Sequence, residues 1–78
     1  MMLSPMEEKE FYKVMKKVGR NLRKVRTERN KTQERISEEI GIGIKYYQQL
    51  ENGDRALSMR SLFRLSKRLK VTFESLIL

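Results

Sequence analysis

Two glycines, Gly41 and Gly53, constrain the fold of this chain more than any other feature. Glycine adopts the left-handed backbone conformation without steric cost, and a residue in that conformation commonly ends a helix. The apolar residues before each glycine recur at helical spacing and predict two short helices, over 33–40 and 44–52. We therefore expect these two helices to meet at a turn of only three residues.

Capping signals and apolar residues at helical spacing predict three further helices. A capping box with proline, over residues 4–7, begins a long helix that is expected to end near Arg29. Gly19 lies inside this helix, at a position where the helix can bend or break. Ser58 and Thr72 are suited to cap a fourth helix and a short fifth one. Strand signals are weak, so the predicted fold class is all-α, with five helices.

The residue types that are absent exclude several classes of protein. The chain has no cysteine and no histidine, which removes disulfides, thiol nucleophiles, zinc fingers and the usual general base. No apolar run approaches the roughly 20 residues that span a bilayer, and the N-terminus does not read as a signal peptide. From its 78 residues we expect one small cytoplasmic domain that is not an enzyme and binds no metal, cofactor or small molecule.

The net charge of +8 favours a polyanionic partner, which means DNA, RNA or an acidic membrane. Basic residues outnumber acidic ones in 18–30 and 58–78, whereas the middle of the chain is slightly acidic. The excess charge therefore lies on segments that also carry periodic apolar residues, and not on a disordered tail. Three acidic residues near the N-terminus argue against membrane binding by the first helix: Glu7, Glu8 and Glu10.

The two short helices and their turn, over 32–53, follow the helix-turn-helix plan, in which the second helix lies in the major groove of DNA. Residues 18–78 resemble the Cro/phage-repressor-like helix-turn-helix family, which includes restriction–modification controller proteins. The matching features are Gly19–Arg26, Thr32-Gln33, Gly41-Ile42, Leu50-Glu51-Asn52-Gly53, Arg55, Ser58, Leu62 and Val71–Leu76. The resemblance implies a compact lambda-repressor-like DNA-binding domain over 18–78, with 1–17 as an N-terminal helical extension.

The resemblance also implies which residues of the second short helix, the recognition helix, contact bases. Lys45 can donate to guanine, Gln49 can pair with adenine, and Ile44 can pack on a thymine methyl group. Tyr46 completes the expected base-contacting set, and its ring or hydroxyl can also reach a sugar or a phosphate. The alternative for Lys45 and Gln49 is a solvated helix face, and for Ile44 it is a place in the core or in a dimer interface.

Four polar residues are expected to contact phosphates on either side of these bases: Gln33, Gln48, Asn52 and Arg55. Gln33 opens the first short helix, where free backbone N–H groups favour an anion. Asn52 and Arg55 flank the end of the recognition helix and are expected to clamp the next phosphate. The alternatives are a simple first-turn polar residue for Gln33 and an exposed loop residue for Arg55.

In the family, the residues that match Arg26 and Glu51 form a salt bridge between the first helix and the recognition helix. Glu51 shares a side of its helix with Tyr47, which is expected in the core, so a partly buried carboxylate there needs a partner. If the pair is buried, removal of one partner is expected to cost roughly 3–5 kcal/mol of stability.

A homodimer is expected because a single recognition helix contacts too few base pairs for useful specificity. Two helices about 34 Å apart read the halves of a near-palindrome. The short final helix cannot bury all of its apolar residues in its own core, and the predicted interface is Phe73, Ile77 and Leu78. A competing face lies on the first helix: Phe11, Val14 and Met15.

The predicted function is regulation of transcription by sequence-specific binding of double-stranded DNA, as a repressor or a small autoregulating controller. An antitoxin-type autoregulator is a variant of this prediction. The alternative from another class is an adaptor or RNA-binding module that uses the same fold without reading an operator. A preference for one duplex over scrambled duplex and RNA separates these alternatives.

Overall fold

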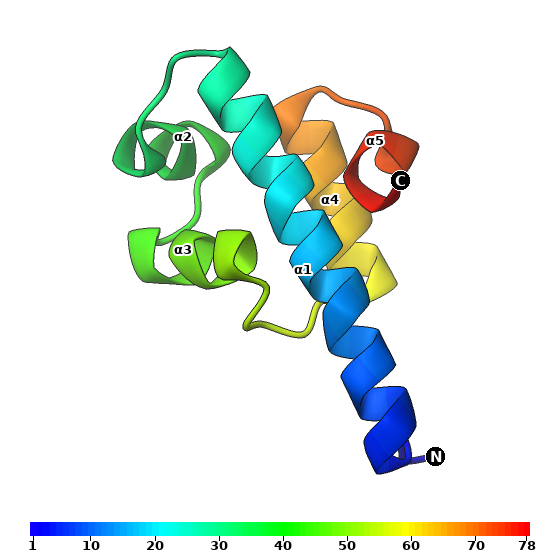
Figure 1. Cartoon of the computed structure of the whole chain (residues 1–78). Coiled ribbons are helices and arrows are strands. Elements are labelled where there is room, and N and C mark those ends of the chain that lie inside the picture. Colours follow the sequence, from blue (N-terminus) through cyan, green and yellow to red (C-terminus); the bar gives the residue numbers. More distant parts are fainter.

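Helix α1 (Pro5–Glu28) dominates the computed structural model, which describes all 78 residues of the chain. Its N-terminus is closed by the expected capping box, in which Ser4 Oγ accepts from the backbone N–H of Glu7 and the Glu7 carboxylate accepts from that of Ser4. The helix continues unbroken through Gly19, so of the two possibilities considered there, a bend or a break, the break does not occur. Figure 1 shows α1 crossing the whole molecule, with its first turns projecting beyond the other helices.

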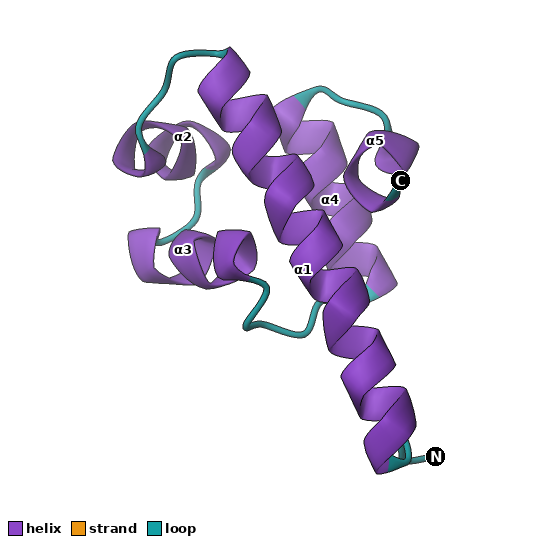
Figure 2. Cartoon of the chain, viewed as in Figure 1, coloured by secondary structure: helices purple, strands orange, loops and turns teal.

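Four shorter helices follow: α2 (Gln33–Ile40), α3 (Ile44–Asn52), α4 (Met59–Leu69) and α5 (Phe73–Ile77). The predicted all-α class and the order of the five helices are confirmed, and the structure contains no strand (Figure 2). None of the helices combines the length and the apolar character that crossing a lipid bilayer demands.

Local capping explains where most of these helices begin and end. Hydroxyl side chains accept a backbone N–H at the start of α2, α4 and α5, whereas α3 begins at Gly43 without such a cap. Left-handed residues end α2, α3 and α4: Gly41, Gly53 and Lys70. Lys70 adopts φ 58°, which glycine would adopt at lower cost.

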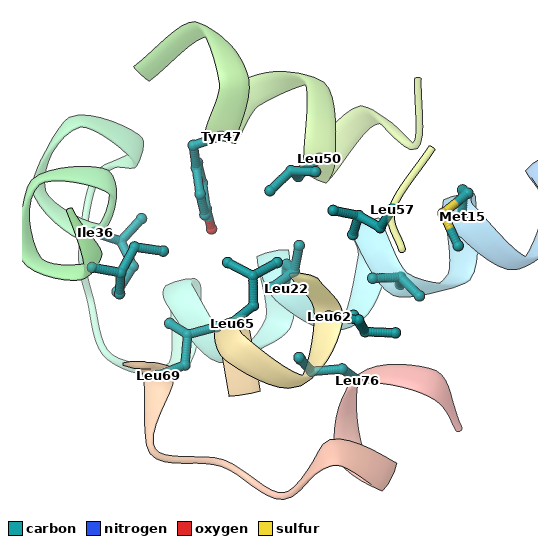
Figure 3. Packing of buried hydrophobic residues seen from close by; sticks show 12 residues of the cluster. Met15, Leu22, Ile36, Tyr47, Leu50, Leu57, Leu62, Leu65, Leu69 and Leu76 are labelled. Atoms are coloured by element: carbon teal, nitrogen blue, oxygen red, sulfur yellow. The ribbon is translucent and has the colours of Figure 1, made fainter. Parts of the chain in front are cut away.

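The core consists of twelve buried apolar residues that come from all five helices and from the segment before α4. Figure 3 shows Tyr47 and Leu50 pointing from α3 towards Leu22 of α1 and Leu65 of α4. The remaining members are Met15, Val18, Ile36, Ile40, Leu57, Leu62, Leu69 and Leu76. Met15 lies before the expected start of the domain at residue 18, so α1 contributes to the core from both sides of that boundary.

Packing fixes α3 from two directions, because α1 lies against its C-terminal half and α2 lies beside it. Arginines link other helix ends: Arg29 Nη2 donates to the Leu69 carbonyl at 2.7 Å, and Arg68 Nη1 donates to the Ile40 carbonyl at 2.9 Å. These bonds satisfy carbonyls that have no partner within their own helices. The outer face of α3 is left free of any covering element.

Candidate nucleic-acid interface

The two helices of the candidate interface meet at a three-residue turn whose geometry depends on Gly41. This residue ends α2 with φ 71°, and its N–H bonds back to the last turn of α2. Ile42 then donates its backbone N–H to the Ser37 carbonyl at 3.0 Å, which closes the end of the helix. The half-buried Ile42 side chain packs against the core at this corner. The turn therefore fixes the point in the sequence at which the chain leaves α2 and changes direction into α3.

The exposed ridge of α3 carries Lys45, Gln49 and Asn52, whose side chains are solvent accessible. Spacings of four and three residues place the three side chains along one side of the helix. Ile44 and Tyr46, which complete the predicted base-contacting set, are half-buried beside this ridge. The structure thus places the five residues on the accessible part of one helix.

Arg55, in the loop after α3, joins two of the predicted DNA-contacting residues. Its guanidinium lies over the ring of Tyr46, 5.1 Å from the ring centroid, in the geometry of a cation–π contact. Its Nη1 also donates to Gln49 Oε1 at 3.3 Å. The amide nitrogen of Gln49 is therefore turned away from the arginine, as a free donor. The sequence pattern gave no sign of this link, since the residues are six apart and span the end of a helix.

Behind the ridge, the carboxylate of Glu51 accepts hydrogen bonds from three side chains. Arg26 donates from Nε to Glu51 Oε2 at 2.6 Å and from Nη2 to Oε1 at 3.2 Å, so the ion pair expected between α1 and α3 is present. The Tyr47 hydroxyl donates to Oε2, and Gln33 Nε2 donates to Oε1 at 3.0 Å. The Glu51 side chain is only 3% exposed, so these donors replace the water that it lost.

Opposing effects act on the pKa of Glu51. Burial by itself raises the pKa of this carboxyl, but the hydrogen bonds from Arg26, Tyr47 and Gln33 outweigh it and hold the pKa below its ordinary value. Burial, followed by the bond to Glu51, raises the pKa of the Tyr47 hydroxyl. The hydrogen bond to Glu51 raises the pKa of Arg26. The group at neutral pH is therefore a carboxylate, a guanidinium and a protonated phenol.

The same carboxylate orients two of the residues that were predicted to contact phosphates. Gln33, the first residue of α2, donates to Glu51 through Nε2, and its Oε1 accepts from Gln48 Nε2 at 3.2 Å. Both glutamines are half-buried between α2 and α3. Each amide nitrogen has a second hydrogen that these bonds leave unused. The two amides thus have fixed orientations and retain donors for an anion.

Two glycines bring the backbone of α1 against the end of α3. A Cβ built on Gly19 would lie 2.3 Å from the Glu51 carbonyl oxygen and 2.7 Å from that of Leu50. A Cβ on Gly53 would lie 2.6 Å from the Cα of Lys16. Only glycine fits at these distances, so Gly19 serves close packing and not a bend. Nothing in the local sequence around Gly19 could have revealed the segment that fills this space.

Comparison with known proteins supports the interpretation of α2 and α3 as a helix-turn-helix. Residues 22–76 match the family model for helix-turn-helix proteins. The fold is similar to that in the crystal structure of the restriction-modification controller protein C.AhdI from Aeromonas hydrophila, with a TM-score of 0.69 and 27% sequence identity; the match covers 80% of this chain and 94% of that chain. No curated protein matches the chain. The family match includes α2, the turn and α3, and it excludes the first 21 residues.

Proposed function

This chain belongs to the helix-turn-helix family and is a DNA-binding regulator, and from that premise we propose that it binds a near-palindromic operator as a homodimer to regulate transcription. The observation that carries the proposal is the exposed ridge of α3, defined by Lys45, Gln49 and Asn52, on a helix that is anchored from behind by Tyr47 and Leu50. An anchored helix with an exposed polar side is suited to enter a major groove.

Within this proposal, base reading is assigned to Ile44, Lys45, Tyr46 and Gln49. Lys45 is free to donate to guanine O6 or N7, and Gln49 offers its amide to adenine. Because Arg55 holds the Gln49 oxygen, the amide nitrogen of Gln49 is presented to an acceptor such as a purine N7. Contact with phosphates is assigned to Gln33, Gln48, Asn52 and Arg55.

The homodimer is proposed to form through apolar side chains of α4, α5 and the C-terminal residue that the fold leaves uncovered. Phe63 is 51% exposed and its ring lies 6.4 Å from that of Phe73, which is half-buried. Leu78 is 77% exposed, and Ile77 is half-buried next to it. Burial of such a patch against a second copy removes apolar surface from water on both subunits.

The similarity to a restriction-modification controller protein favours a small autoregulating controller or repressor over the antitoxin-type regulator. An adaptor or RNA-binding module remains the second candidate. It is supported only by the net charge of +8, which attracts any polyanion.

Selection of bound duplexes from a random pool tests the proposed function. The wild-type protein is expected to enrich a near-palindrome, and to bind it more tightly than a scrambled duplex or an RNA of equal length. Lys45→Ala and Gln49→Ala should each relax the preference at particular base pairs, by about 1–3 kcal/mol per lost contact. Arg55→Ala should weaken binding to all duplexes and, because Arg55 holds the Gln49 oxygen, should also relax the preference at the base pair that Gln49 contacts.

Two results would contradict the proposal. One is a wild-type protein that binds scrambled duplex as well as any selected sequence. The other is a Lys45→Ala, Gln49→Ala double variant that keeps the full preference of the wild type. Tighter binding to RNA than to every duplex would favour the second candidate.

A further inference from the structure

A stripe of basic side chains follows α1 on the side that faces away from the core. The basic stripe consists of Lys9, Lys13, Lys16, Lys17, Arg20, Arg23 and Lys24. At about 100° per residue these side chains fall within an arc of about 120°, roughly opposite the buried side of the helix. All seven are exposed, and none of them forms an ion pair.

The acidic residues of α1 do not neutralise this stripe. They lie on its edge or on other sides of the helix: Glu7, Glu8, Glu10 and Glu28. Like charges three and four residues apart weaken a helix by about 0.2–0.5 kcal/mol per pair, and the stripe contains several such pairs. A solvated helix face normally mixes both signs of charge, whereas a field of one sign attracts a partner of the opposite sign.

The basic stripe adjoins the candidate interface at the end of α3. Lys16 Nζ lies 3.5 Å from the carbonyl oxygen of Asn52, and the backbone of Lys16 packs against Gly53. From there the stripe runs along the N-terminal half of α1, which projects past the other helices (Figure 1). From Lys16 to Lys9 the helix rises about 10 Å, the axial length of about three nucleotides of one strand.

We propose that Lys9, Lys13 and Lys16 bind the phosphates of duplex DNA that flanks the half-site under α3. The inference rests on the proposed function, because it requires α3 to lie on a duplex. It concerns a part of the chain outside the family match, which begins at residue 22. The N-terminal half of α1 thereby lengthens the contact with the DNA backbone without adding sequence preference, since phosphates carry no base identity.

The test compares the wild type with the double variant Lys9→Gln, Lys13→Gln on the selected operator. Both lysines are exposed and have no hydrogen-bonded partner, and glutamine has a similar helix propensity, so the fold should be unchanged by circular dichroism. Lys16 is left in place because it contacts Asn52. Lys9→Arg, Lys13→Arg is the matched control that keeps the charge.

The double glutamine variant should lower the slope of log K against log salt by about 1.8 per protomer, since each phosphate contact contributes about 0.9. Hydroxyl-radical footprinting should lose protection of the flanks only, and the selected sequence should not change. Trimming the flanks from the duplex should weaken binding of the wild type severalfold, and should weaken the glutamine variant by less, because that variant keeps only Lys16 of the three lysines. The arginine control should behave as the wild type does.

An unchanged slope, or a reduced slope with an unchanged footprint, would overturn the inference, and the second result would indicate long-range attraction alone. In either case a wild-type protein that still prefers its operator leaves the proposed function intact. A wild-type protein with no preference for any duplex contradicts the proposed function, and the inference with it.

Discussion

At the scale of single residues, Glu51 connects the core to the candidate interface. The expected Arg26 partner followed from the family resemblance, and the position of Tyr47 followed from its side of the helix. The hydrogen bonds to Glu51 from the Tyr47 hydroxyl and from Gln33 were not predicted. The spacing of residues along a helix gives the side on which a residue lies, but not the position of the terminal atoms of a long side chain. Such contacts depend on how α2 and α3 cross, which no local pattern encodes.

Replacement of the Glu51 carboxylate should make the free energy of unfolding of this protein less dependent on pH in the acidic range. Its pKa is lowered in the folded state, so the ion pair stabilises the fold fully above the ordinary pKa of about 4.3 and progressively less as the pH falls through the lower folded value. Urea unfolding should show wild type more stable than Glu51→Gln at pH 7, with the difference shrinking in acid. Parallel stability profiles for the two proteins would contradict this expectation.

Tyr47→Phe provides a finer test of the same group. The variant keeps the buried ring, which is fully inaccessible to solvent, and removes one donor to a charged acceptor. It should lower the free energy of unfolding by about 1.5–3 kcal/mol, less than the roughly 3–5 kcal/mol expected for Glu51→Ala. Equal stability of Tyr47→Phe and wild type, by urea unfolding at pH 7, would mean that the hydroxyl contributes nothing to the group.

At the scale of elements, the sequence predicted the helices well because most boundaries have a local chemical cause. Thr32, Ser58 and the glycines at 41 and 53 act on their immediate neighbours, and the structure bears out each of these positions. Gly19 was noted only as a place where α1 can bend or break, and its packing role was not predicted. Its role depends on the carbonyls at the end of α3, some thirty residues later in the chain.

Gly41 and Gly53 offer a matched pair for measuring how closely α1 and α3 pack. Both adopt φ 71°, so alanine at either position should cost about 1–2 kcal/mol of backbone strain. A Cβ at Gly41 meets no atom nearer than 3.7 Å, whereas a Cβ at Gly53 collides with the backbone of Lys16. Gly53→Ala should therefore be less stable than Gly41→Ala by a further 1–3 kcal/mol or so. Equal losses in the free energy of unfolding of the two variants, measured in urea, would show that α1 shifts at little cost to make room for the added methyl group.

At the scale of the whole molecule, neither sequence nor fold specifies the dimer by itself. Of the competing face on α1, one residue is already used by the core: Met15 is buried, whereas Val14 is 50% exposed. On the other candidate face, formed by Phe63, Phe73, Ile77 and Leu78, Phe63 is as exposed as Val14, and Leu78 is 77% exposed. Sequence patterns predicted both candidate faces, but only the packing of α1 showed how much of the α1 face is buried in the protein's own core.

Leu78→Asp and Val14→Asp distinguish the two faces. Both side chains are exposed, so neither change should alter monomer stability by more than about 0.5 kcal/mol. Sedimentation equilibrium should show that Leu78→Asp weakens dimerisation at least tenfold, which corresponds to about 1.4 kcal/mol, while Val14→Asp does not. The reverse result would place the interface on α1.

The glycine contacts that fasten the end of α3 to α1 also bear on which operators this protein can select. Because the backbone of α1 packs directly against the end of α3, the recognition helix has little freedom to tilt. If the shape of the groove does not match this helix, the DNA must therefore deform. The elastic cost of that adjustment depends on flexible steps such as TA and CA, including steps that no side chain touches. We therefore expect the spacer between half-sites to be selected for its deformability.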